Sequence, residues 1–490
     1  MGRHIGGWAL LWLLGLLGSR AAAAEFGKSC PVELWGTSEA GPGAPAPSGG
    51  WAVVALRGEQ IDLQLAVRRR DGGLTGPASL DLEGPRGRRL EARLFREAGP
   101  TDDRLLPQGP EGFAVPPDAP VTLWAIVAVP ADAAAGDYRA EARLGGCRIE
   151  IGRLRVAPLA TPQVPALRVV APRTLLAPNL ARDPVLALAV RHGLSPEELW
   201  GLGGADWSQF EEKLGPYLGS PGVDGPGIAA LVLPDPGAGG DLQRFQALID
   251  AEQRLRRRGF SGEVVAFGGD EFDGPGGVDR AAALHRAVPG VELVMGKPAA
   301  DLGGLADATS LPFGQSGETL SLDSPAREPR PTRLWWTLGV SPGERLPTLA
   351  PGGDRRAVRA IGWMAYENGV VGLRLESSGA GAAADLVGRG LDGQPVSTVR
   401  LERLRQAVQD YGLLKLAAGQ GLAREARLAA RQLSPAVDRW PKGEGAFEAA
   451  REGLVARLRA TARRPSSAAK TRRSRRSGAR PAGPGRPPGA

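Results

Sequence analysis

The pattern of apolar residues changes abruptly near Pro162, and this change constrains the fold more than any other feature of the chain. Before it, apolar and polar residues alternate in runs such as 61–67 and 123–129, and Gly and Pro turns separate the runs. Alternation with a period of two is typical of strands that bury one face. Residues 25–162 are therefore predicted to form an antiparallel β-sandwich.

After Pro162, short buried strands alternate with helices. The apolar runs 229–233, 264–267 and 291–295 are predicted strands, and a helix that starts at Asp241 and ends at Gly259 joins the first two. This alternation is typical of a parallel α/β domain, which we assign to residues 163–395. From 396 to 460 the sequence becomes rich in Arg and Leu and predicts helices that pack against this domain.

Residues 1–24 have the pattern of a secretory signal peptide. Arg3 and His4 precede an apolar stretch over 8–14, and four alanines precede Glu25. We predict cleavage after these alanines, which implies a secreted or periplasmic protein. The apolar stretch is shorter than the ~20 residues of a membrane-spanning helix, and no transmembrane segment is expected after removal of the signal.

The end of the chain carries much of the positive charge. Residues 461–490 hold nine Lys and Arg side chains and no Asp or Glu, whereas the whole chain has a net charge of +8. Without this tail, Arg3 and Arg20, the net charge is −3, which does not suit a nucleic-acid partner. The tail is rich in Pro, Ser, Gly and Ala and is predicted to be disordered. Its charge suits contact with anionic envelope polymers, and a solvated extension without a partner is the alternative.

Cysteine and histidine are scarce, which excludes several kinds of site. Cys30 and Cys147 are the two cysteines, and His4, His192 and His285 are the three histidines. The sequence has no HExxH and no paired CxxC motif, so we predict no metal site and no cofactor. His192 and His285 fall in predicted helices and are expected at a surface or an interface. Cys30 and Cys147 are candidates for a disulfide that closes the N-terminal domain of an exported protein.

Asp270 and Glu271 are the main candidates for chemistry. They follow the apolar run 264–267 and two glycines, as residues beyond the end of a buried strand do. In barrels of parallel strands the reactive groups lie at the carboxyl ends of the strands, and two carboxylates there suggest chemistry on a sugar. The alternative is a strand-to-helix turn, in which Asp and Glu favour the N-terminus of the helix.

Several separated segments match one known family in order. They are 103–107 (DRLLP), 123–124 (LW), 129–138 (VPADAAAGDY), 206–210 (DWSQF), 269–271 (GDE), 334–336 (LWW), 359–372, 400–405 and 409–411. Together they resemble glycoside hydrolase family 123, whose C-terminal module is also called domain of unknown function 4091. The resemblance covers nearly the whole chain after the signal peptide. It implies a (β/α)8 TIM-like barrel behind the sandwich, with a C-terminal helical extension.

The resemblance also implies an activity. It indicates an exo-acting retaining β-N-acetylhexosaminidase, of the N-acetylgalactosaminide type, that acts on an amino-sugar-containing glycan. In such an enzyme the 2-acetamido oxygen of the substrate attacks C1, so one protein acid suffices, whereas ordinary retaining glycosidases use two carboxylates about 5 Å apart. By this resemblance Glu271 is the acid/base, and Asp270 accepts the acetamido N–H.

Trp335 and Trp336 are candidate substrate-binding residues that could form an apolar wall beside the sugar. The alternative is that both fill the barrel core, as large aromatic side chains commonly do. The chain departs from the family pattern at Phe272, where Pro is usual, and at Thr337, where Tyr is common.

A third departure lies on the predicted last strand. The segment 373–376 (LRLE) stands where the family pattern has Trp. Within it, Glu376 is a candidate substrate-binding residue, and a salt bridge to Arg374 or to another Arg at the barrel mouth is the alternative for its carboxylate.

These departures keep two other functions open. One is a catalytically degenerate relative that binds carbohydrate or serves in the envelope. The other is a two-carboxylate glycosidase with Glu271 as the acid and Glu376 as the nucleophile, which requires carboxyl groups about 5 Å apart.

Overall fold

The computed structural model describes the chain in segments with gaps between them. The described residues are 32–37, 51–69, 74–99, 102–116, 120–144, 147–197, 227–232, 242–257, 259–268, 277–296, 306–313, 333–339, 346–376 and 385–462. The predicted signal peptide and the basic tail lie outside these segments.

The N-terminal part consists of two five-stranded sheets that share one core. The first has the order β1-β3-β10-β7-β8 and the second the order β2-β12-β11-β5-β6. The strands of the first sheet are β1 (Val32–Thr37), β3 (Gln60–Arg69), β10 (Val121–Ala128), β7 (Ala92–Glu97) and β8 (Leu105–Pro107). Those of the second are β2 (Trp51–Arg57), β12 (Cys147–Ala160), β11 (Gly136–Leu144), β5 (Ala78–Glu83) and β6 (Arg89–Leu90). Buried side chains from both sheets form a single cluster, as in a sandwich.

One pair of strands differs from the antiparallel prediction. β2 pairs with β12 in the parallel direction, whereas the other described pairs of these two sheets are antiparallel. β2 and β12 lie far apart in the sequence, so no hairpin turn imposes an antiparallel direction on them. A short ribbon of β4 (Leu74–Gly76) and β9 (Phe113–Val115) lies beside the first sheet.

The second part of the chain forms a nearly closed parallel barrel of eight strands. Their order is β14-β13-β20-β19-β18-β17-β16-β15, and every described pair is parallel. The strands are β13 (Arg168–Ala171), β14 (Leu194–Pro196), β15 (Ala230–Val232), β16 (Glu263–Phe267), β17 (Val291–Met295), β18 (Ala308–Pro312), β19 (Leu334–Gly339) and β20 (Val370–Glu376). Between the two end strands, Ala230 N–H donates to Ser195 Oγ over 3.1 Å. The Ser195 side chain therefore links β14 to β15, the two end strands of the sheet.

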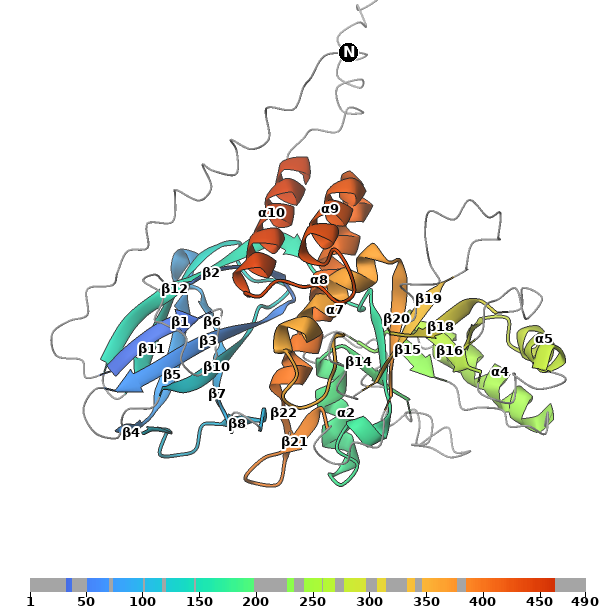
Figure 1. Cartoon of the computed structure of the whole chain (residues 1–490), viewed down its shortest axis with the longest axis horizontal. Helices are drawn as coiled ribbons and strands as arrows, with labels where there is room; N and C mark the ends of the chain where they lie inside the picture. The colour runs from blue at the N-terminus through green and yellow to red at the C-terminus, as the bar shows by residue number, and fades with distance from the viewer. Residues whose placement is uncertain are drawn as a thin grey trace, which may run out of the picture.

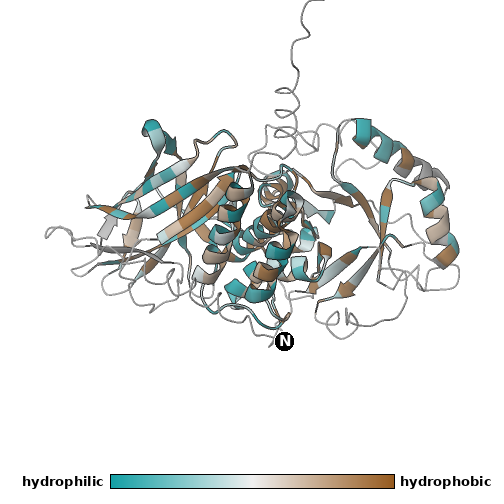
Figure 2. Cartoon of the chain, turned by 90° about the horizontal axis from the view of Figure 1, so that it is seen from above, coloured by the Kyte–Doolittle hydropathy of each residue, from teal (hydrophilic) through white to brown (hydrophobic). Residues whose placement is uncertain are grey.

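Helices between the strands cover the outside of the barrel (Figure 1). They are α2 (Arg182–Arg191), α4 (Leu242–Arg257), α5 (Gly277–Ala287) and α7 (Arg355–Glu367). The predicted helix before Asp270 is confirmed as α4, and Gly259 after it has φ +82°, the left-handed conformation of a C-cap glycine. Figure 2 shows hydrophobic residues along the strands of both parts and mixed hydropathy on the helices, as expected for helices with one buried face.

Three further helices follow the last barrel strand. A hairpin of β21 (Val387–Arg389) and β22 (Pro395–Ser397) leads into α8 (Val399–Ala417), and α9 (Ala423–Leu433) and α10 (Gly445–Ala462) come next. α8 lies centrally, between the sandwich and the barrel (Figure 1). It approaches α7 closely because residue 362 is glycine: a Cβ there would lie 2.0 Å from the Ala407 carbonyl oxygen. No described helix is long and apolar enough to cross a membrane.

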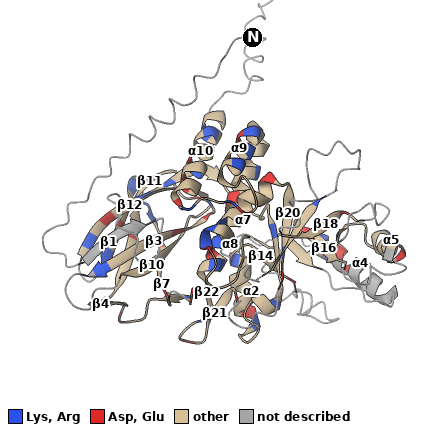
Figure 3. Cartoon of the chain, viewed as in Figure 1, with Lys and Arg blue, Asp and Glu red and all other residues tan. Residues whose placement is uncertain are grey.

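α8 is joined to the sandwich by buried charges. Arg405 donates to Glu402 Oε2 on its own helix over 2.9 Å and to Asp62 on β3. Arg400 donates to Asp103 Oδ2 over 2.8 Å and to the Leu349 carbonyl over 2.6 Å. The concentration of basic side chains on α8 is visible in Figure 3. The Arg405–Asp62 pair lies on the outer face of β3, where the side chains of Asp62 and Gln64 are buried instead of solvated.

A second buried cluster centres on Asp410 of α8. Its carboxylate accepts from Arg359 Nε over 3.0 Å and from Trp363 Nε1 over 2.9 Å, both on α7, and from Arg451 on α10. Arg451 in turn donates to both carboxylate oxygens of Glu59 in the sandwich, over 2.9 and 2.8 Å. One side chain therefore links three helices and, through Arg451, the sandwich.

We predict that this cluster makes stability sensitive to acid. Burial raises the pKa of Asp410, but Arg359 and Arg451 outweigh burial and hold it below the usual value of 3.8. A carboxyl with a lowered pKa stabilises the fold above its unfolded pKa, and this contribution is lost as the pH falls through the folded pKa. Thermal unfolding should therefore shift to lower temperature below about pH 4, as measured by circular dichroism at pH 3 to 7.

Asp410→Asn provides the control for this prediction. It should lower the free energy of unfolding at pH 7 by about 3–5 kcal/mol, because it removes the buried negative charge to which Arg359 and Arg451 both donate, and it should flatten the acid limb. Burial raises the pKa of Asp62 to about 7, so that group contributes less stability as the pH rises toward 7. An acid limb of equal steepness in the wild type and in Asp410→Asn would contradict the assignment to Asp410.

Candidate active site at the barrel mouth

A cluster of charged residues closes the amino end of the barrel. Arg168 on β13 donates to Glu292 Oε2 over 3.1 Å and to Glu263 Oε1 over 3.0 Å, and Arg333 donates to the same Glu292 oxygen over 3.0 Å. All four residues lie at or near the starts of their strands. A ligand site built on the strands therefore has its open side at their carboxyl ends, as in other parallel barrels.

Trp335 fills the middle of the barrel. Its side chain is fully buried in a cluster of interior residues, and its Nε1 donates to Glu292 Oε1 over 3.2 Å, toward the amino end. Gly372 on β20 leaves room for it, since a Cβ at that position would lie 2.3 Å from the indole ring. These contacts fit the alternative prediction for Trp335, in which its side chain fills the barrel core.

Trp336 lies on the other side of β19. Its side chain is fully buried in the cluster that joins the barrel to α7 and α8, and its ring packs edge-on against Phe313 with centroids 4.7 Å apart. Consecutive residues of a strand point to opposite faces. Trp336 therefore packs outside the barrel while Trp335 and Thr337 face its interior.

Above Trp335, polar side chains replace apolar ones. Ser310 Oγ on β18 lies 2.8 Å from Thr337 Oγ1 on β19. Each hydroxyl carries one proton, so one proton joins the pair and the other is available to a further acceptor. Thr337 stands where the family pattern has Tyr, and its hydroxyl is held by Ser310.

The carboxyl ends of three strands meet at Arg374. Arg374 on β20 donates from Nη2 to Glu197 Oε1, just after β14, over 2.9 Å. Its guanidinium carbon lies 4.6 Å from the ring centroid of Phe267, the last residue of β16, and Phe267 packs edge-on against Trp335 at 5.4 Å. The predicted alternative for Glu376, a salt bridge to Arg374, is not found: Arg374 pairs with Glu197, and Glu376 is exposed at the end of β20.

The pair Asp270-Glu271 follows β16, one of the strands that end at this mouth. β16 ends at Phe267, and Gly268 N–H still donates to the Val294 carbonyl of β17 over 2.9 Å. Asp270 and Glu271 lie outside the described residues, so their roles stay predictions.

The two histidines after the signal peptide make structural contacts. His192, at the end of α2, is buried: its Nε2 lies 2.8 Å from Glu402 Oε1 and 3.2 Å from Ser397 Oγ. Ser397 and Glu402 thus contact the same ring nitrogen of His192, whereas in a catalytic triad the serine and the carboxylate contact opposite ring nitrogens. His285 Nε2 on α5 lies 3.2 Å from Asp307 Oδ2.

Cys147 starts β12, is buried and is disulfide-bonded. Cys30 lies outside the described residues, so the pairing of the two cysteines stays a prediction. Among the side chains that the structure describes, no group of three or more His, Cys, Asp or Glu is arranged to hold a metal ion.

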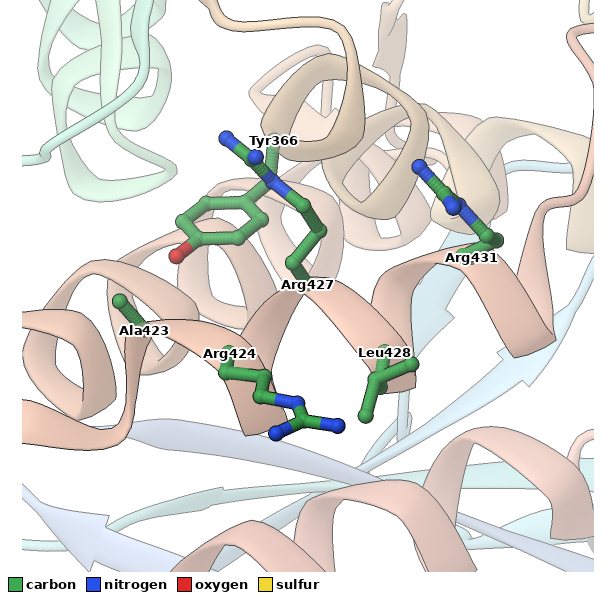
Figure 4. Close-up of a pocket in the computed structure, with 6 residues that line it drawn as sticks. All are labelled: Tyr366, Ala423, Arg424, Arg427, Leu428 and Arg431. Carbon is green, nitrogen blue, oxygen red and sulfur yellow. The ribbon is translucent and has the colours of Figure 1, made fainter. Parts of the chain in front are cut away.

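A pocket of about 320 Å³ lies away from the barrel mouth, between α7 and α9 (Figure 4). Its lining includes Tyr366 near the end of α7 and three arginines of α9. Figure 4 shows Arg424 and Arg427 pointing to opposite sides of the helix, and Arg431 is paired with Glu367 at 2.6 Å. These arginines do not converge on one ligand position. Tyr366 precedes β20, so the pocket lies toward the amino end of the barrel.

Sequence reasoning missed Glu197 and Ser310 as residues of the mouth, and it named Arg374 only as a partner for Glu376. A signal was present for Glu197 and Arg374. Glu197 directly follows a short buried strand, as Asp270 follows β16, and Arg374 is the charged residue in the middle of an apolar strand.

Comparisons with known proteins support the fold. No protein-family model and no curated protein matches the chain. Among solved structures, it is similar to a family 123 glycoside hydrolase from Clostridium perfringens, with a TM-score of 0.56 and 11% identity over 89% of this chain and 99% of that chain. A GH5 xyloglucanase from Bacteroides ovatus also matches, with a TM-score of 0.29 and 8% identity over 73% of this chain and 98% of that chain. That score is too low to support an argument. The chain therefore has a glycoside hydrolase-like fold, with a sandwich followed by a barrel.

Proposed function

We propose that the chain is a secreted glycoside hydrolase, an exo-acting retaining β-N-acetylhexosaminidase of the N-acetylgalactosaminide type. One observation carries the proposal: the sequence Asp270-Glu271 follows β16 in a barrel whose fold resembles that of a family 123 glycoside hydrolase over nearly its whole length. The closed amino end of the barrel supports a site at the opposite end. The pattern of residues 1–24 supports export, and the charge of residues 461–490 suits contact with anionic envelope polymers.

The proposed reaction uses the substrate's own acetamido group. Glu271 protonates the glycosidic oxygen as the acetamido oxygen attacks C1, so the bond to the leaving group breaks and a bicyclic oxazolinium ion forms. Asp270 accepts the acetamido N–H, which orients the group and stabilises the positive charge. Glu271 then removes a proton from water as the water oxygen attacks C1 and opens the ring, which restores the original configuration and the protonated acid.

A carbohydrate-binding protein without hydrolytic activity is the second candidate. Two observations favour it. Thr337 Oγ1 is engaged by Ser310 at a position where the family pattern has a longer Tyr. Arg374 follows Leu373 on β20, in the segment where the family pattern has a stacking Trp.

The first prediction from this proposed function concerns Glu271 as the acid/base. Glu271→Gln should lower the rate of hydrolysis of 4-nitrophenyl β-N-acetylgalactosaminide by ~10²–10⁴-fold, because the leaving oxygen loses its proton donor. The thermal unfolding temperature should stay within a few degrees of the wild type. The same assay on the β-N-acetylglucosaminide determines which sugar is preferred. An unchanged rate in Glu271→Gln would reject its role, and a folded wild type without activity on either sugar would favour the second candidate.

The second prediction concerns substrate assistance. Asp270→Asn should lower the rate on acetamido sugars about as strongly as Glu271→Gln does, since it removes the group that orients the attacking acetamide. Any activity on plain β-galactosides should be unaffected. Equal losses on both kinds of substrate would argue against substrate assistance.

A further inference from the structure

Arg374 has a guanidinium with few partners at the barrel mouth. Its Nη2 donates one hydrogen bond to Glu197, and its Nε is buried without a partner. No other hydrogen bond of this side chain is formed within the described part of the chain. A guanidinium has five N–H donors, so most of the donors of Arg374 have no acceptor among the described residues.

Arg400 and Arg405, two buried arginines of α8, differ from Arg374, whereas buried Arg403 also has an Nε without a partner. Arg400 donates to the Asp103 carboxylate and to the carbonyls of Leu349 and Asp385. Arg405 donates to four acceptors, including Glu402 and Asp62. In these cases the fold supplies the acceptors that a buried guanidinium requires. At Arg374, whose side chain is 31% exposed, the described residues supply one acceptor, Glu197, and leave the buried Nε without one.

The orientation of Arg374 is fixed without those acceptors. Glu197 accepts from Nη2, and the guanidinium carbon lies over the Phe267 ring, 4.6 Å from its centroid. Glu197 likewise uses only Oε1 for this pair and is partly exposed. The pair thus offers N–H donors and a carboxylate acceptor side by side, at the carboxyl ends of β20 and β14.

The described charges beside this pair indicate which ligand suits it. Glu197 neutralises Arg374, and Glu376 adds a further exposed carboxylate at the end of β20. A ligand with its own carboxylate or sulfate would be repelled by this surplus. Sugar hydroxyls are neutral, and each both accepts and donates a hydrogen bond, so two adjacent hydroxyls match an Arg and Glu pair.

We propose that Arg374 and Glu197 bind adjacent hydroxyl groups of an uncharged terminal pyranose at the barrel mouth. Arg374 donates to the hydroxyl oxygens, and Glu197 accepts from their protons. This inference rests on the proposed function and adds its specificity: the terminal sugar carries no sulfate or carboxylate.

The test is a binding measurement, which does not require turnover. Isothermal titration calorimetry with N-acetylgalactosamine should show that Arg374→Met binds about 10- to 100-fold more weakly than the wild type, as for loss of hydrogen bonds from a charged donor. Glu197→Gln should weaken binding in the same direction. Arg424→Met, which removes an exposed arginine of α9, is the matched control and should bind like the wild type. Thermal unfolding of each variant verifies that the variant is folded.

Two further ligands test the class of sugar. Removing a contacted hydroxyl should remove the effect of the substitution, so one of the 3-, 4- or 6-deoxy analogues should bind almost equally to wild type and Arg374→Met. N-acetylgalactosamine 6-sulfate should bind the wild type more weakly than the neutral sugar. Tighter binding of the sulfate that depends on Arg374 would overturn the proposal, and so would wild-type affinity in a folded Arg374→Met.

These measurements distinguish failure of this inference from failure of the proposed hydrolase function. Sugar binding that depends on Arg374, in a protein that hydrolyses neither chromogenic substrate, would support this inference and reject the hydrolase. Hydrolysis that depends on Glu271, with KM and sugar binding both unchanged in Arg374→Met, would support the hydrolase and reject this inference. Absence of sugar binding to the wild type would overturn the inference.

Discussion

The buried charges of α8 hold the two halves of this protein together. Arg405 reaches Asp62 of the sandwich, Asp410 accepts from both α7 and α10, and Arg451 carries the connection back to Glu59. A buried charge is costly unless it is paired and hydrogen-bonded, so each of these residues requires the others in place. The arrangement of sandwich and barrel therefore depends on the packing of one helix that follows the last barrel strand.

The barrel uses charge differently at its two ends. At the amino end, Arg168, Arg333, Glu263 and Glu292 satisfy one another, and Trp335 adds a donor to Glu292. That end is a closed and stabilising layer. At the carboxyl end, Arg374 has one acceptor among the described residues, Glu197, and its buried Nε lacks a partner. The difference between the two ends is the physical basis for assigning ligand binding to the carboxyl end.

Much of the architecture could be predicted from local patterns. The runs 264–267 and 291–295 became β16 and β17, and Gly259 caps α4, because strand periodicity and positive φ are properties of short segments. The parallel pairing of β2 with β12 and the partners of α8 could not be predicted, since they join residues far apart in the sequence. The pair of Glu197 and Arg374 was missed for the same reason: β20, the last barrel strand, reaches β13 and its neighbour β14 only when the sheet curls round.

A crystal structure of the protein with N-acetylgalactosamine thiazoline, a stable analogue of the oxazolinium ion, would test the account most directly. We expect the ligand at the carboxyl ends of the barrel strands, with ring hydroxyls on Arg374 and Glu197 and the thiazoline nitrogen within hydrogen-bond distance of Asp270. Binding elsewhere, such as in the arginine-lined pocket on α9, or failure to bind at millimolar concentration, would contradict the assignment of this barrel mouth as the site of a substrate-assisted hexosaminidase.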